Sequence, residues 1–198
     1  QKQDNAFRVF ILGESSAAGW PYVPNASFPR HINRKLELLY PDNTIEVINC
    51  GMSAINTYTL RDFVPGIIEQ NPDLIIIYTG HNEYYGALGA GSSVSLGYSR
   101  TLVNTYLKLI DFKTMQLLQN IISGIYGIFS SSNEKEGEAG NETLMSRMIG
   151  ESLIPIDSDI YNYGIQQFAG NMDDILQMFM EKDIPVILGT LTCNLKDQ

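Results

Sequence analysis

Short runs of apolar residues alternate along the chain with longer stretches in which apolar and polar residues recur at helical spacing. Four of the short runs predict β-strands, since they are rich in apolar and β-branched residues and end at turn-forming residues. These runs are Arg8–Leu12, Thr44–Asn49, Leu74–Tyr78 and Pro185–Gly189. Several of them are continuously apolar, which is typical of strands that are covered on both faces in a parallel sheet.

The stretches between the strand candidates predict helices, at Phe28–Tyr40, Asn56–Asp73 and Asp159–Pro185. In the first of them, Ile32, Leu36 and Leu39 fall on one helical face. The second contains a Pro-Gly pair that we expect to interrupt the helix. The third has an apolar stripe that indicates core packing and not a cofactor site. That stripe consists of Phe168, Met172, Ile175, Leu176 and Phe179.

The segment between the third and fourth strands is long and changes character along its length. It predicts an insert at about residues 86–157, which opens with a mobile loop rich in glycine, serine and alanine at Gly86–Gly97. Thr101–Phe129 is apolar and broadly helical, and the polar stretch 130–142 predicts a flexible loop. The β-α-β-α-β order predicts one α/β domain over residues 1–198, a three-layer α/β/α sandwich with a parallel sheet.

The composition narrows the classes of function. The 13 Lys and Arg residues against 22 Asp and Glu residues give a net charge of −9, without the basic clusters that nucleic-acid binding needs. The two cysteines, Cys50 and Cys193, follow apolar runs and predict free thiols near strand ends. No apolar run approaches the ~20 residues of a membrane span. The start without Met suits a processed chain, so the compartment stays open, an extracytoplasmic one included.

Small and polar residues follow three of the predicted strands, where ligands bind in open α/β sheets. The first strand runs into Gly13-Glu14-Ser15-Ser16, the second into Cys50-Gly51-Met52, and the third into Gly80-His81-Asn82-Glu83. Acyl transfer needs a hydroxyl that attacks and donors that hold the developing oxyanion. Ser15 could supply the hydroxyl, Gly51 a closely approachable backbone N–H, and Asn82 a side-chain NH2 group.

Other interpretations of these loops are weaker or stay open. The first loop matches neither a P-loop, nor G-x-G-x-x-G, nor the G-x-S-x-G elbow. A flavodoxin-like phosphate loop stays open, and Ser15 could simply cap the helix that follows, with Gly51 in a turn of positive φ. Glu14 and Glu83 do not indicate a metal site, because no His or Cys cluster accompanies them. We expect no cofactor and no metal.

In this order and at these positions, GESSAAG, NCGMS and GHNE resemble blocks I, II and III of the SGNH (GDSL) hydrolases. The longer context is similar to SGNH domains of bacterial proteins that can also carry tetratricopeptide repeats. The resemblance implies a flavodoxin-like sandwich and hydrolysis of carboxylic esters, such as lipid esters or acetyl groups on sugars. It also implies that Ser15 is the nucleophile, with its own N–H, the N–H of Gly51 and the Asn82 amide as oxyanion hole.

The chain departs from the family pattern at three points. Glu14 and Glu83 stand where the family has Asp, and both substitutions keep the charge. The third departure concerns the base, since the family's C-terminal D-x-x-H motif does not occur in this sequence. His31 lies on a predicted helix, and His81 adjoins Asn82 and so tends to point in another direction.

Without a base within hydrogen-bond reach, a serine hydroxyl is a poor nucleophile. We therefore expect a C-terminally truncated SGNH domain that, as it stands, is a poor esterase or none. The alternatives are a non-catalytic SGNH-like binding module and a flavodoxin-like binder of phosphate or flavin. The sequence leaves the substrate and the oligomeric state open.

Overall fold

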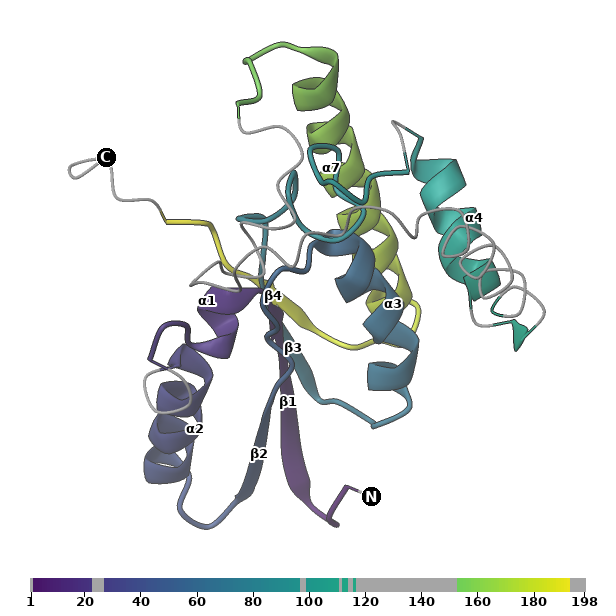
Figure 1. The fold of residues 1–198 in the computed structure, drawn as a ribbon. Coiled ribbons are helices and arrows are strands. Elements are labelled where there is room, and N and C mark those ends of the chain that lie inside the picture. Colours follow the sequence, from purple (N-terminus) through teal and green to yellow (C-terminus); the bar gives the residue numbers. More distant parts are fainter. Residues whose placement is uncertain are drawn as a thin grey trace, which may run out of the picture.

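The computed structural model describes residues 2–22, 27–96, 99–110, 112–113, 116 and 153–192. Its centre is a four-stranded sheet in the order β2-β1-β3-β4, in which every neighbouring pair is parallel (Figure 1). The strands are β1 (Ala6–Gly13), β2 (Thr44–Asn49), β3 (Leu74–Tyr78) and β4 (Val186–Leu188). The four predicted strands and the parallel sheet are thus confirmed, β1 being longer and β4 shorter than expected.

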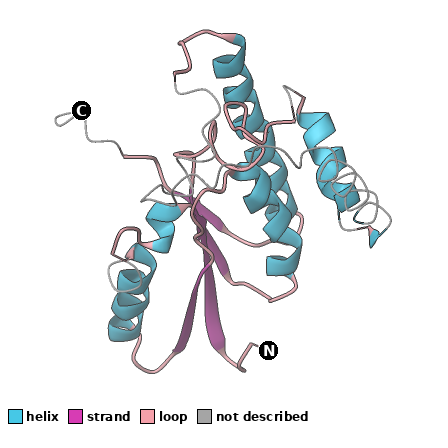
Figure 2. Cartoon of the chain, in the orientation of Figure 1, coloured by secondary structure: helices cyan, strands magenta, loops and turns pink. Residues whose placement is uncertain are grey.

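Helices cover both faces of this sheet, as the sequence predicts (Figures 1 and 2). On one side lie α1 (Ser15–Ala18) and α2 (Phe28–Leu39). On the other side lie α3 (Thr57–Ile68) and α7 (Asp159–Met180), with α4 (Arg100–Ile110) beyond them. The fold is therefore the expected α/β/α sandwich. No helix in the described part of the chain is long and apolar enough to cross a membrane.

The core lies between the sheet and the pair α3 and α7. Residues of β1 and β3 pack there against Leu60 and Val64 of α3 and against the predicted stripe of α7. In that stripe Met172, Ile175 and Phe179 are buried, and its other two members are partly buried against the same cluster. The buried strand residues of the cluster are Phe10, Leu12, Ile75 and Ile77.

The expectation that the Pro-Gly pair interrupts the second helix was wrong. α3 continues through Pro65 and Gly66 to Ile68, although the pair was expected to interrupt it. Proline removes one N–H from a helix, and here it stands in the last turn on the exposed side, where that loss costs little. The predicted helix with Ile32, Leu36 and Leu39 is present as α2, and Leu39, its last residue, has 70% of its surface exposed.

The glycine-rich segment after β3 is packed rather than mobile over residues 86–92. Gly86, Gly89 and Gly91 are buried, and the N–H groups of Gly86 and Gly91 donate to the carbonyls of Asn82 and Tyr84 at 2.6 and 2.8 Å. A Cβ atom at Gly89 would stand 2.5 Å from the Tyr84 carbonyl oxygen. The glycines therefore permit close backbone packing. The flexible loop expected at 130–142, and most of the insert, lie outside the described residues.

Candidate active site

The strand order β2-β1-β3-β4 places a topological switch point at the carboxyl ends of β1 and β3. The chain leaves β1 toward α1 and α2 on one face and leaves β3 toward α4 on the side of the other face, so that the connections diverge between these two neighbouring strands. In open α/β sheets, ligands bind at such a switch point, beyond the carboxyl ends of the strands. Ser15 follows β1 and Asn82 follows β3, so both predicted residues lie at this edge of the sheet.

The side chain of Glu14 connects these two strand ends. It is fully buried and accepts hydrogen bonds from Thr79 Oγ1 at 2.8 Å, from the Gly80 N–H at 2.9 Å and from the Asn82 N–H at 3.0 Å. The carboxylate of Glu14, which directly precedes Ser15, thus binds three donors of the β3 loop. This contact brings the candidate nucleophile and the loop of the candidate oxyanion donor together.

Ser15 is the first residue of α1 and not its N-cap. The cap position belongs to Glu14, whose side chain makes no capping bond because it is directed into the β3 loop. Ser15 is partly exposed, and its hydroxyl has no hydrogen-bond partner among the described residues. The cap interpretation of this serine is therefore wrong. Its hydroxyl stands at a helix N-terminus, beside backbone N–H groups that no side chain caps.

Gly51 packs directly on α1. A Cβ atom at this position would stand 2.4 Å from the Ala18 nitrogen, so only glycine fits here. Its φ is not in the left-handed region, so close approach and not a positive-φ turn requires the glycine. The Gly51 N–H donates to Asn49 Oδ1 at 2.9 Å, while Asn49 Nδ2 donates to the Ala17 carbonyl at 2.9 Å. Gly51 is therefore near α1, with its N–H already engaged.

Asn82 and Glu83 end the β3 loop in a nearly closed environment. Asn82 is 9% exposed, and its carbonyl accepts the Gly86 N–H at 2.6 Å. Glu83 is 3% exposed and turns away from the sheet edge toward the first turn of α3. Burial raises the pKa of the Glu83 carboxyl, against the hydrogen bonds from Thr57 and Gln167, and the nearby charge of Glu14 raises it further.

Neither histidine reaches Ser15 through a hydrogen bond. His81 Nδ1 lies 3.8 Å from Glu14 Oε2, and its ring meets the edge of the Tyr78 ring with centroids 5.3 Å apart. His31 is exposed on α2. Within the described ranges, no group of three or more His, Cys, Asp and Glu residues could hold a metal ion.

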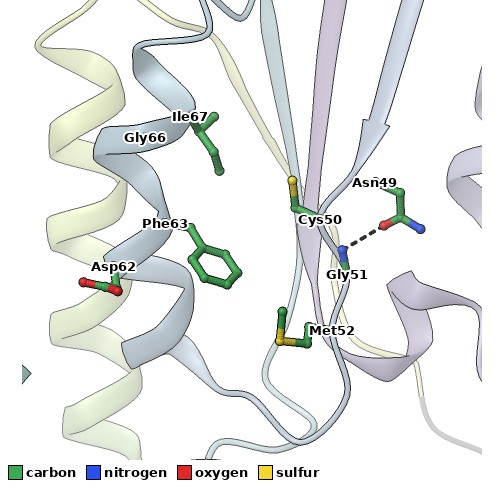
Figure 3. Close-up of a pocket in the computed structure, with 8 residues that line it drawn as sticks. All are labelled: Asn49, Cys50, Gly51, Met52, Asp62, Phe63, Gly66 and Ile67. Atoms are coloured by element: carbon green, nitrogen blue, oxygen red, sulfur yellow. Dashed lines mark hydrogen bonds between the residues drawn. The ribbon is translucent and has the colours of Figure 1, made fainter.

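A pocket of about 520 Å³ lies beside Gly51, between the end of β2 and α3 (Figure 3). Apolar side chains line it from both elements, among them Met52, Phe63 and Ile67, and burial raises the pKa of the Cys50 thiol at its wall. In Figure 3 the bond from the Gly51 N–H to Asn49 is directed away from these side chains. The pocket is thus on the α3 side of this loop, whereas the Gly51 backbone packs on α1.

Three residues of this region were not singled out in the sequence. Asn49 is the last residue of β2 and Thr79 directly follows β3, and a polar residue at the end of an apolar strand is a usable indication. Gln167 gives no such indication, because it stands in the middle of α7 among other polar residues. Only the packing of α7 shows that it contacts Glu83.

No family model and no curated protein matches this chain. Among solved structures it is similar to AlinE4, an SGNH-hydrolase family esterase, with 14% identity and a TM-score of 0.47 over 94% of this chain. The psychrotrophic esterase EstA from Pseudoalteromonas sp. matches with 13% identity and a TM-score of 0.37, over 92% of this chain and 76% of that one. The chain spans 60% of the AlinE4 chain. AlinE4 is an esterase of the SGNH-hydrolase family, which is the family that the three motifs resemble.

Proposed function

We propose that this chain supplies the nucleophile and the oxyanion donors of an SGNH-type serine hydrolase that acts on carboxylic esters. The observation that supports it most is the Glu14 carboxylate, which ties the residue before Ser15 to the backbone of Asn82. Acyl transfer needs a hydroxyl and hydrogen-bond donors around one carbonyl group. Lipid esters and acetylated sugars are the proposed substrate classes, as in the family that the motifs resemble.

In this reaction the Ser15 Oγ attacks the ester carbonyl carbon, and its proton passes to a general base. The carbonyl oxygen becomes an oxyanion, stabilised by the Asn82 side-chain amide and by the N–H groups of Ser15 and Gly51. The Gly51 N–H must leave or share its bond to Asn49 to take part. The ester C–O bond then breaks, the alcohol leaves with the proton, and water cleaves acyl-Ser15 to the carboxylic acid.

The general base is the part that the described residues do not supply. His31 and His81 make no hydrogen bond to Ser15, and the sequence has no D-x-x-H. We assign the base to a histidine outside these 198 residues. Dissolved imidazole should then replace it in part, because it can accept the Ser15 proton from solution.

The test is labelling of the purified chain with a fluorophosphonate ester, followed by peptide mass spectrometry. We expect a slow covalent adduct at Ser15, whose rate rises with imidazole concentration and is lost in Ser15→Ala. Ser16→Ala is the matched control and should label like the unaltered chain. A chain that is never modified at Ser15, even with imidazole and in its longest natural form, would contradict the proposal.

A second candidate is a non-catalytic binding module with the same fold, favoured because no side chain of the described residues makes a hydrogen bond to Ser15 as a base would. It would hold an ester or glycan at the same strand ends without cleaving it. An assay of the longest natural form of the chain distinguishes the two candidates. Ester hydrolysis that depends on Ser15 supports the enzyme, and binding of an acetylated sugar without turnover supports the module.

A further inference from the structure

Glu83 is the centre of a buried polar network behind the candidate site. Its carboxylate accepts hydrogen bonds from Thr57 Oγ1 at 2.6 Å, from the Thr57 N–H at 3.2 Å and from Gln167 Nε2 at 2.6 Å. Thr57 opens α3 and Gln167 lies in the middle of α7. One side chain therefore fastens the end of the β3 loop to both helices that pack on this face of the sheet.

The network continues away from the site through polar side chains. Asn171 Nδ2 donates to Thr57 Oγ1 at 3.0 Å, and Arg100 Nε donates to Asn171 Oδ1 at 2.9 Å. No Lys or Arg among the described residues contacts the Glu83 carboxylate itself. Gln167 is fully buried, and its Oε1 is the one buried side-chain N or O atom of the described residues without a hydrogen-bond partner.

A buried carboxylate and an unpartnered amide oxygen both cost free energy, so this arrangement is poor as a purely stabilising device. The network does, however, fix the position of the loop that contains Asn82. Glu83 directly follows Asn82, and Glu14 holds the N–H of Asn82 from the other side. The residue that would donate to the oxyanion is thus fixed between two buried carboxylates, one on each side of the loop.

From this geometry we infer that Glu83 is a positioning residue of the proposed ester-cleaving site, which it serves by fixing the Asn82 loop against α3 and α7. The effect of Glu83 on the reaction rests on the proposed function, whereas its effect on the loop does not. Glutamine at this position has the same size but only one acceptor oxygen. Its NH2 group would meet the donors of Thr57 or Gln167.

The experiment compares Glu83→Gln, the conservative variant Glu83→Asp and the control Glu46→Gln. Glu46 is an acidic residue of β2 that pairs with Arg8, remote from the loop in the sequence and in the sheet. Amide hydrogen exchange of the peptide 79–86 is measured together with the maximal rate and the half-saturating concentration of fluorophosphonate labelling in imidazole. Thermal unfolding shows whether each variant is folded at the assay temperature.

We expect Glu83→Gln to speed exchange in 79–86 and to lower the maximal labelling rate by roughly 10- to 100-fold, because small displacements of catalytic groups cost that much. The half-saturating concentration should stay within about twofold, since substrate binding does not depend on the oxyanion donor. Glu83→Asp should recover part of the rate, and Glu46→Gln should change neither readout.

A folded Glu83→Gln variant with unchanged exchange in 79–86 overturns the inference, and so does faster exchange with an unchanged labelling rate. Loss of labelling that Glu83→Asp does not recover at all also contradicts it. If the unaltered chain is never labelled at Ser15, the proposed function fails and the role in the reaction fails with it. The exchange data alone then report whether Glu83 holds the loop.

Discussion

The two ends of the sheet hold their acidic side chains in different ways. At the amino end, Arg8 of β1 pairs with Glu46 at 2.5 Å, and its own N–H donates to Asp73 at 2.6 Å. Lys2 pairs with Asp73 at 2.5 Å. The hydrogen bond from Arg8 lowers the pKa of Glu46, against the effect of desolvation. These acids therefore stand beside cations, as is usual for acidic groups that stabilise a fold.

At the carboxyl end, Glu14 and Glu83 are more deeply buried and have only neutral donors among the described hydrogen bonds. Burial raises the pKa of Glu83 where pairing lowers that of Glu46. Neutral backbone and amide donors compensate a buried charge less than an ion pair would, but they fix the direction of loop N–H groups. The acids of the amino end are thus paired with cations, whereas those of the carboxyl end hold loop N–H and side-chain donors in fixed directions.

The comparison is tested most strongly by removing one carboxylate at each end. Glu14→Ala leaves three donors without an acceptor, those of Thr79, Gly80 and Asn82, and should lower the free energy of unfolding by roughly 3–5 kcal/mol. Glu46→Ala should cost clearly less, because Glu46 is more exposed. Urea unfolding measures both values, and equal losses would mean that the two ends do not differ.

Removal of the proposed oxyanion donor separates function from stability at the carboxyl end. Asn82→Ala should reduce the rate of Ser15 labelling about 10²- to 10³-fold. The unfolding midpoint should change little, because Glu14 bonds the backbone N–H of Asn82 and not its side chain. Labelling kinetics and thermal unfolding of the same preparation check both parts. A large drop in the unfolding midpoint with an unchanged labelling rate would mean that the Asn82 side chain stabilises the fold and takes no part in the reaction.

The pH dependence of stability should have opposite signs at the two ends. Glu83 has a pKa above the ordinary value of 4.5, so the folded state holds its proton more tightly and loses stability as pH rises from about 4.5 through the raised pKa. The unfolding free energy of the unaltered chain minus that of Glu83→Gln should fall over this range. The same difference for Glu46→Gln should rise with pH below 4.5, because pairing lowers that pKa. Chemical unfolding at a series of pH values measures both differences, and like signs would contradict this account.

The smallest expected difference between the two ends of the sheet is in how salt changes the stability loss caused by each variant. The ion pair between Arg8 and Glu46 is partly exposed, so the destabilisation caused by Glu46→Gln should shrink between 0.05 and 1 M NaCl, where the Debye length falls to about 3 Å. The effect of Glu83→Gln should stay nearly constant, since its partners are neutral and buried. Unfolding midpoints at both salt concentrations test this. Equal salt dependence of the two variants would remove this part of the contrast.

The sequence predicts the sheet and the three loops because both depend on local patterns. Apolar runs mark the strands, and Ser15, Gly51 and Asn82 stand in the short loops that follow them. The supporting contacts depend on tertiary packing and have no local pattern. Gln167 reaches Glu83 across 84 positions, and the fit of Gly51 against Ala18 depends on how α1 lies on the loop after β2. The predicted interruption at Pro65 was wrong because the sequence pattern does not show that this residue is exposed near the end of α3.

The central claim is that the carboxyl ends of β1 and β3 form an oxyanion site around Ser15. A crystal structure of the chain after fluorophosphonate treatment in imidazole tests it most directly. We expect phosphorus bonded to Ser15 Oγ and a phosphonyl oxygen within about 2.7–3.1 Å of Asn82 Nδ2 and of the Ser15 N–H. The Gly51 N–H should turn from Asn49 toward the same oxygen. A phosphonyl oxygen directed into solvent, with Asn82 and Gly51 unmoved and out of reach, would contradict the account.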